Sequence, residues 1–401
     1  MKYVIILCDG MADEPLLLLD GETPMETADT FHMDELAKIS ELGMVRTIPE
    51  DMEPGSDTAN LSVLGYNPRA YYSGRSPLEA LSMGVNLKDS DVSFRCNLVT
   101  LSEEQAEYDK KIMLDHSADE ITSEEAAVLI QALEDELPVA GYAFYPGISY
   151  RHLLVQEQGE VIPLTPPHDI LDQEIGNYLT HPAILREMMV KSYDILQMHP
   201  INKERRKRGL KPANSAWFWG AGVKPSLPLF EEKYGIKGAM ISAVDLLKGI
   251  AIGSGMDNIH VIGVTGGLDN DYLGQGEAAV YALLEEGYDF VYVHIEAPDE
   301  MGHQGNCKDK IKSIEYIDQL IVGPMVAELT AAKVPFRFMI LPDHPTPVAL
   351  RTHTKNPVPY LLYDSEKKVI GCEKFDEKEA KRTGIYVDQG EHLIKKLFNL
   401  T

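Results

Sequence analysis

The sequence has few of the features that mark an exported or membrane-bound protein. Its four cysteines lie far apart and form no Cys-x-x-Cys pair, at Cys8, Cys96, Cys307 and Cys372. They are expected to be reduced thiols, because a disulfide framework or a thiolate metal site needs them clustered. No apolar run approaches the length of about 20 residues that a membrane helix needs, and Lys2–Leu7 is too short for a signal peptide. These absences predict a cytoplasmic protein with no membrane partner.

Positive charge is scarce. Lysine and arginine number 37 against 63 aspartates and glutamates, so the formal net charge is −26. Such a surface repels nucleic acid and anionic lipid, and no nucleic-acid partner is expected. The basic cluster at Lys203–Arg208 is interpreted as a solvated helix end or a linker. If the substrate is an anion, its site must supply its own cations as metal ions, arginines or both.

Apolar and β-branched residues are plentiful and fall into short runs. The runs that predict buried strands of a parallel sheet include Lys2–Leu7, Phe290–Ile295 and Phe336–Leu341. Helical patterns alternate with such runs at both ends of the 401-residue chain, but this alternation of strand and helix patterns is interrupted in the middle. The sequence therefore predicts an α/β fold: a doubly wound, mainly parallel sheet core from residues 1-86 and 210-401, with an inserted smaller α/β domain at 87-209.

Residues of the metal-ligand type follow three of the predicted strands. They are Asp9 after the first, Asp299 and His303 after the second, and Asp343, His344 and His353 after the third. In open α/β sheets chemistry collects at the carboxyl ends of strands, and residues four apart share one side of a helical turn. An isolated Asp-His turn or i,i+4 pair is usually structural. Together these residues predict a site for two divalent ions, with manganese, zinc or cobalt better suited than calcium.

A serine motif, Pro54–Asn60, is predicted to form a turn that opens a helix. Its serine, Ser56, has two interpretations. It can be a simple N-cap, or it can present an exposed hydroxyl where a helix N-terminus favours phosphate. A nearby pair of metal ions favours the second interpretation, because coordination lowers the pKa of a hydroxyl and makes it a nucleophile.

These motifs resemble a known family. Asp9-Gly10, Gly55–Asn60, Asp299-x-x-x-His303, Asp343-His344 and His353 resemble the alkaline phosphatase superfamily of two-metal phosphotransferases. The similarity is closer to the archaeal-type 2,3-bisphosphoglycerate-independent phosphoglycerate mutases, and it spans nearly the whole chain. The additional motifs are Asn60–Tyr66, Arg95–Asn97, Ser149–Leu154, Pro212–Ser215, Trp217–Gly220 and Thr265–Asn270. Two small departures, Ser76 for a usual glycine and Pro345 for a commoner serine, remove neither a ligand nor the nucleophile.

The resemblance implies a ligand set. One ion would be held by Asp9, Ser56, Asp343 and His344, and the other by Asp299, His303 and His353. It implies two divalent ions, with Mn²⁺ favoured and Zn²⁺, Co²⁺ or Mg²⁺ as alternatives, and no need for 2,3-bisphosphoglycerate as cofactor. The substrate would be a small phosphorylated hydroxy acid. The oligomeric state is not predicted.

The implied activity is that of an isomerase of glycolysis and gluconeogenesis. Ser56 would take the phosphoryl group from 3-phosphoglycerate, and the 2-hydroxyl of the bound glycerate would take it back. The inserted domain would exclude water and hold the glycerate carboxylate, for which arginine is well suited. The candidate substrate-binding residues are Arg95, Asn97, Arg151, His152, His168, Asp169 and Lys224. Alternatives are a metal-dependent phosphatase, another phosphomutase of the superfamily, or a metal-stabilised binding protein without activity.

Overall fold

A computed structural model describes residues 1–179 and 183–400. The chain divides into two compact units, which are described separately below. Unit 1 comprises Met1–Tyr72 and Ser226–Thr401, and unit 2 comprises Ser73–Pro225. Within the described residues, no helix is long and apolar enough to cross a membrane.

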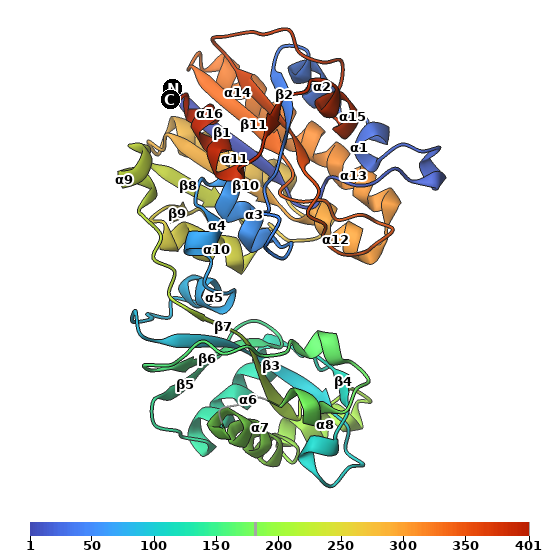
Figure 1. Ribbon diagram of the computed structural model, residues 1–401, viewed down its shortest axis with the longest axis vertical. Coiled ribbons are helices and arrows are strands. Elements are labelled where there is room, and N and C mark those ends of the chain that lie inside the picture. The colour runs from blue at the N-terminus through green and yellow to red at the C-terminus, as the bar shows by residue number, and fades with distance from the viewer. Residues whose placement is uncertain (180–182, 401) are drawn as a thin grey trace. The chain divides into compact units, whose positions relative to one another are not determined.

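Unit 1 is built on one mainly parallel sheet (Figure 1). In spatial order its strands are β13 (Tyr386–Val387), β2 (Glu41–Val45), β12 (Val358–Asp364), β11 (Phe336–Leu341), β1 (Lys2–Cys8), β10 (Phe290–Ile295), β8 (Gly238–Ile241) and β9 (Asp257–Asn258). Strand β1 lies between β10 and β11 and is parallel to both, while β12 runs antiparallel to its two neighbours. The predicted mainly parallel α/β core is therefore confirmed.

Helices cover this sheet on both sides. The consecutive residues Val4, Ile5, Ile6 and Leu7 of β1 are all fully buried, which requires cover on both faces because side chains alternate along a strand. The helices of unit 1 are α1 (Pro24–Thr27), α2 (Phe31–Ala37), α3 (Ser56–Val63), α4 (Pro68–Tyr71), α9 (Phe230–Tyr234), α10 (Asp245–Gly253), α11 (Tyr272–Leu284), α12 (Ala297–Gln304), α13 (Cys307–Ile317), α14 (Gly323–Ala331), α15 (Glu377–Arg382) and α16 (Leu393–Phe398). A π-helical segment, Asp318–Val322, joins α13 to α14.

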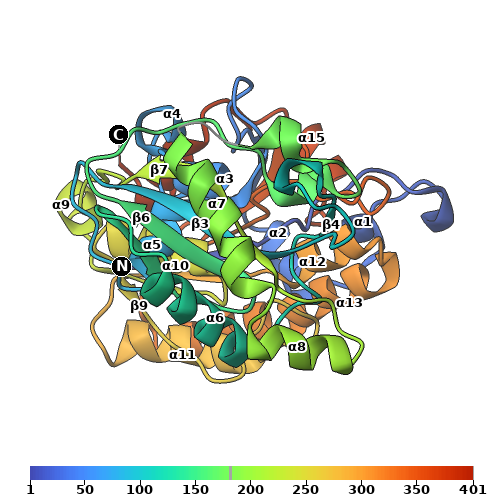
Figure 2. The same ribbon diagram turned by 90° about the horizontal axis from the view of Figure 1, so that it is seen from below.

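Unit 2 is built on an antiparallel sheet around the long strand β3 (Val92–Leu101). Its other strands are β4 (Met113–Asp115), β5 (Tyr142–Tyr145), β6 (Arg151–Gln156) and β7 (Ser215–Val223), and its helices are α5 (Ser76–Ser82), α6 (Ser123–Glu136), α7 (Ala183–Leu196) and α8 (Pro200–Lys207). Helices α6 and α7 lie over one face of the sheet (Figures 1 and 2), where Phe94, Cys96 and Leu98 form an apolar core with them. The opposite face presents the alternate residues of β3, including Arg95 and Asn97.

The limits of unit 2 differ from the predicted 87-209. Strand β7 pairs with β3 along most of its length, and α5 packs against β3 and β7. These contacts attach residues 73–86 and 210–225 to the inserted unit. Local patterns could not show this, because the partner of β7 lies more than a hundred residues earlier in the chain. The Gly220–Gly222 segment is part of β7.

A buried polar network fastens helix α13 of unit 1 to neighbouring loops. The Lys310 ammonium donates hydrogen bonds to the Asp13 carboxylate (2.7 Å) and to the backbone carbonyls of Ala12 (3.2 Å) and Thr346 (2.8 Å). Glu377 joins the network by accepting hydrogen bonds from the Asp13 amide (3.1 Å) and the Thr23 hydroxyl (2.8 Å). Burial raises the pKa of Glu377 from 4.5 to about 7, because its hydrogen bonds only partly offset the loss of solvent.

We predict that Glu377→Gln makes the protein less sensitive to rising pH. A raised carboxyl pKa means that the folded state holds a proton that the unfolded state has lost between about pH 4.5 and 7. Folding stability from this group therefore falls as pH rises through that window and is constant above it. The unfolding free energy of the variant minus that of the parent should therefore rise by on the order of 2–3 kcal/mol from pH 5 to pH 8.

Urea unfolding at the two pH values, followed by circular dichroism, measures this gain. The control is Glu366→Gln on an exposed turn, which should show no such change. A difference between Glu377→Gln and the parent that stays constant from pH 5 to 8 would contradict the prediction.

Candidate active site

The candidate metal ligands of unit 1 come from three adjacent strands. Asp9 directly follows β1, Asp299 lies in the first turn of α12 after β10, and Asp343 follows β11. Because β1, β10 and β11 are neighbours and parallel, their carboxyl ends meet at the same edge of the sheet. The predicted residues are therefore brought together by the sheet topology itself.

The first group of possible ligands is Asp9, Asp343 and His344, which are all buried and offer ligand atoms within 4.8 Å of one another. The Asp343 carboxylate is held by three donors: the backbone amides of Gly10 (3.1 Å) and His344 (2.8 Å), and the Asn60 side-chain amide (3.0 Å). Gly10 has φ +61°, and a Cβ there would lie 2.6 Å from Asp299. Only glycine fits this turn.

Asp9 has a carboxylate oxygen without a hydrogen-bond partner. Its Oδ2 lies 2.9 Å from His294 Nε2, but its buried Oδ1 has no hydrogen-bond partner. Burial, and next the neighbouring carboxylates of Asp343 and Asp299, raise the pKa of Asp9 well above its usual range. Buried carboxylates this close together repel one another when ionised, so a positive charge between them would stabilise the ionised form.

The second group is Asp299, His344 and His353, again with ligand atoms within 4.8 Å of one another. His303 adjoins it, with Nε2 at 3.3 Å from Asp299 Oδ2 and 2.9 Å from His353 Nε2. Burial opposes ionisation of Asp299, but hydrogen bonds with His303 and His353 outweigh it and lower the pKa of Asp299 well below its usual range. The Asp299 contact in turn raises the pKa of His303 to about 9. His344 belongs to both groups, so the two are contiguous.

Ser56 is the first residue of α3 and not its cap. The N-cap is Gly55, in extended conformation, and no side chain caps the helix there. The Ser56 hydroxyl is instead 3.1 Å from His344 Nε2, at the junction of the two ligand groups. The side chain of Asp57 accepts the hydrogen bond of the Thr58 amide (2.8 Å). The serine hydroxyl therefore has no capping role and lies among the metal-ligand groups.

This arrangement fits a pair of divalent ions. Three carboxylates, three imidazoles and one hydroxyl converge in two overlapping groups, and one buried carboxylate oxygen lacks a partner. The mixture of carboxylate and imidazole donors is typical of transition-metal and zinc sites.

Two predicted substrate-binding residues of unit 2 lie in a polar cluster on the sheet face opposite α6 and α7. Arg95 is buried, forms an ion pair with Glu79 (3.0 Å), and has its guanidinium carbon 4.3 Å from the Trp219 ring centre. Asn97 accepts a hydrogen bond from the Trp219 indole (2.9 Å) and donates one to the His116 carbonyl (3.0 Å). Arg95 already has a carboxylate partner in this cluster.

Further arginine and histidine side chains lie around this cluster. Arg151 is exposed and lies opposite Asn97 in the β3–β6 register, so it shares the same face. The His168 ring packs edge-on against Trp219, with centroids 5.2 Å apart, and lies near the His116 ring at 6.0 Å. His116 was not predicted, although its position just after β4 is a strand-end signal like that of Asp9. Arg75, which lies 3.7 Å from Glu79, was not predicted either.

Three other predicted residues of unit 2 fall outside this cluster or at its margin. His152 lies on the opposite, helix-covered face of the sheet. Its Nδ1 accepts the Gly147 amide (2.9 Å), and burial lowers its pKa to about 3, which keeps the ring neutral. Asp169 is exposed beside His168, at 3.6 Å. Lys224 is half-buried just after β7.

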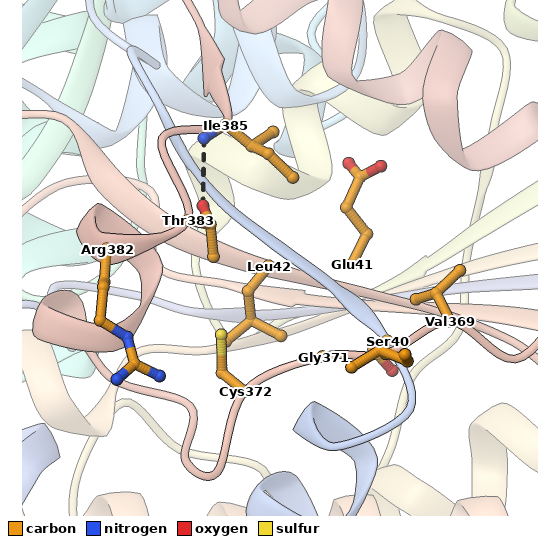
Figure 3. Close-up of a pocket in the computed structure, with 10 residues that line it drawn as sticks. Ser40, Glu41, Leu42, Val369, Gly371, Cys372, Arg382, Thr383 and Ile385 are labelled. Atoms are coloured by element: carbon orange, nitrogen blue, oxygen red, sulfur yellow. Dashed lines mark hydrogen bonds between the residues drawn. The ribbon is translucent and has the colours of Figure 1, made fainter.

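A separate pocket of about 520 Å³ in unit 1 contains none of the predicted site residues (Figure 3). It is lined by residues 40–42, 369–372, 382, 383 and 385. Its charged groups are already paired within the protein: Glu41 binds Tyr360 and Lys396, and Arg382 binds Glu379. The Thr383 hydroxyl accepts the Ile385 amide. Both charged side chains that line this pocket are therefore engaged within the protein.

Comparison with known proteins identifies the family. The family model for 2,3-bisphosphoglycerate-independent phosphoglycerate mutase matches residues 37–202. A 2,3-bisphosphoglycerate-independent phosphoglycerate mutase of Methanothrix thermoacetophila is 45% identical over 400 residues, covering 99% of each chain. The chain belongs to this family. The resemblance predicted from the motifs is thereby confirmed.

Solved structures of similar proteins have the same fold. The structure of the PH0037 protein from Pyrococcus horikoshii has a TM-score of 0.82 and 30% identity, covering 99% of this chain and 97% of that one. A cofactor-independent phosphoglycerate mutase from Thermoplasma acidophilum has a TM-score of 0.67 and 26% identity, covering 100% and 99%. The family thus includes chains of matching length and architecture.

Proposed function

We propose that this protein interconverts 3-phosphoglycerate and 2-phosphoglycerate, in glycolysis and gluconeogenesis, through a phosphorylated Ser56 at a two-metal site. The observation that carries the proposal is the position of the Ser56 hydroxyl, 3.1 Å from His344, where the two ligand groups meet. The family to which the chain belongs supports the choice of reaction. The free cysteines support a cytoplasmic location.

The proposed ligands divide between the two ions largely as the two groups do, with the shared His344 assigned to the first ion. Asp9, Ser56, Asp343 and His344 would hold one ion, and Asp299, His303 and His353 the other. When bound, the ions lower the pKa of the serine hydroxyl and neutralise charge on the phosphoryl oxygens. Mn²⁺ is the proposed metal, with Zn²⁺, Co²⁺ and Mg²⁺ as alternatives, and the reaction needs no 2,3-bisphosphoglycerate.

Ser56 is the residue that forms and breaks bonds. Its hydroxyl loses a proton as Oγ attacks phosphorus, and the bond from phosphorus to the 3-oxygen of the substrate breaks as that oxygen takes up a proton. The glycerate then turns, its 2-hydroxyl loses a proton and attacks phosphoserine, and Ser56 Oγ leaves and takes up a proton. The phosphoryl group is thus returned to the same molecule, and water must be excluded in between.

The sheet face of unit 2 that carries Arg95, Asn97 and Arg151 is the proposed binding surface for the glycerate carboxylate. Arg151 is the best placed of the arginines, because it is exposed while Arg95 is already paired with Glu79. Asn97, His168, Asp169 and Lys224 are proposed to contribute polar contacts. Only the motif resemblance supports a substrate-binding role for His152, because its ring is neutral and lies on the other face.

We predict that Arg151→Ala raises KM for 3-phosphoglycerate by roughly 10-fold or more, with a smaller effect on kcat, because a charge-assisted carboxylate contact is lost. Steady-state kinetics measure this change. The control is Arg186→Ala, an exposed arginine on α7, which covers the opposite face. Equal KM values for the parent and Arg151→Ala would contradict the assignment.

Phosphorus NMR of the protein with Mn²⁺ and 3-phosphoglycerate tests the function itself. The expected product is 2-phosphoglycerate, formed without added 2,3-bisphosphoglycerate and without accumulation of free phosphate. Formation of inorganic phosphate and glycerate, without 2-phosphoglycerate, would identify a phosphatase instead.

A further inference from the structure

Strand β10 carries two polar side chains in an otherwise apolar run. Tyr292 and His294 are two residues apart, so they point to the same face of the sheet. Both are almost completely buried between β1 and β8. Buried polar groups in a central strand are unfavourable unless they are hydrogen-bonded, so their partners reveal what they do.

His294 holds Asp9. As a metal ligand, Asp9 is a carboxylate, which can only accept, so the His294 Nε2–H donates to Asp9 Oδ2 at 2.9 Å. In that tautomer His294 Nδ1 is an acceptor for the Ser242 hydroxyl (3.2 Å), which itself accepts the Val244 amide (3.0 Å). The other oxygen, Asp9 Oδ1, is left without a partner and is the atom presented to the ligand group.

Tyr292 holds Asp343 through Asn60. The Tyr292 hydroxyl donates to Asn60 Oδ1 at 2.5 Å, so the amide nitrogen of Asn60 must face the other way. That nitrogen donates to Asp343 Oδ2 (3.0 Å) and to the backbone carbonyl of Ser56 (2.8 Å). One buried hydroxyl therefore fixes the orientation of an amide that contacts both a ligand and the residue bearing the proposed nucleophile.

Residues from a different segment hydrogen-bond to the ligands of the second group. Asp299 accepts a hydrogen bond from the Thr346 hydroxyl, and His303 Nδ1 lies 3.0 Å from the Arg351 carbonyl. These contacts come from the segment after β11 and not from β10. Disturbing β10 should therefore affect one group more than the other.

We infer that His294 and Tyr292 are positioning residues that orient Asp9 and Asp343 for one of the two ions. This inference rests on the proposed two-ion function. Outer hydrogen-bond partners of metal ligands typically change metal affinity by 10–100-fold when they are lost.

Calorimetric titration of the full-length, chelator-treated protein with Mn²⁺ tests the inference. The variants are Tyr292→Phe and His294→Leu, with His294→Gln as the conservative variant that keeps a donor. Asp343→Asn and Asp299→Asn serve as references that assign the two binding steps. Tyr66→Phe is the matched control, because Tyr66 is also a buried tyrosine but donates to the Pro228 carbonyl (2.9 Å).

Tyr292→Phe and His294→Leu should weaken the step assigned to Asp343 by roughly 10–100-fold and leave the Asp299 step within about threefold of the parent. His294→Gln should recover most of the lost affinity, and Tyr66→Phe should bind both ions normally. Circular dichroism checks folding. If His294→Leu does not fold, Tyr292→Phe decides the matter, since it removes a single oxygen.

Unchanged affinities in folded Tyr292→Phe and His294→Leu would overturn the inference, as would equal weakening of both steps. A parent protein that takes up no Mn²⁺ would instead overturn the two-ion function on which the inference rests. The two failures are therefore distinguishable in one set of titrations.

Discussion

Ser56→Ala is expected to abolish the interconversion of 3-phosphoglycerate and 2-phosphoglycerate, with a loss of roughly four orders of magnitude or more in kcat. The serine Oγ is the proposed acceptor of the phosphoryl group, and it lies 3.1 Å from His344 Nε2. Ions and substrate can still bind to the remaining ligands, but the covalent step has no acceptor.

Two measurements check this result. Phosphorus NMR reports turnover, and intact-protein mass spectrometry after quenching reports phosphorylated enzyme, which should form in the parent and not in the variant. The matched control is Ser62→Ala on the same helix α3, because the Ser62 hydroxyl is buried and has no hydrogen-bond partner. That control should keep both signals. Turnover that persists in Ser56→Ala would rule out the covalent mechanism.

Removal of divalent ions is expected to have the second large effect, a complete and reversible loss of activity. Without positive charge, the buried carboxylates of Asp9, Asp299 and Asp343 face one another across a few ångströms. The protein should therefore also lose thermal stability, because an ion that binds only the folded state stabilises it. Melting temperature and activity should fall together after chelation.

Restoring ions one at a time completes the experiment. Mn²⁺ is expected to recover activity and melting temperature, with Zn²⁺, Co²⁺ and Mg²⁺ as the alternatives to compare. Ca²⁺ is expected to fail, because the imidazole-rich ligand set suits it poorly. Full activity in a sample shown by elemental analysis to contain no divalent metal would contradict the proposed site.

The sequence was most informative where the signal is local. The apolar runs around Val4, Val291 and Phe338 predicted strands of a parallel sheet, and the aspartates that follow them lie where such strands end. The i,i+4 spacing of Asp299 and His303 predicted the shared side of a helical turn, and the two side chains are 3.3 Å apart. Whether these residues hold metal stays a prediction.

The sequence by itself determined the α/β class, the family and the set of residues that could form the site. These features depend on periodicity, on turn chemistry and on motifs that occupy a few consecutive positions. Only the tertiary structure decided that Arg95 is already paired with Glu79, that His152 lies on the covered face of its sheet, and that β7 belongs to unit 2. It alone showed that His294 and Tyr292 support Asp9 and Asp343. These contacts join residues far apart in the chain, and they are set by strand register and packing, which no short stretch of sequence encodes.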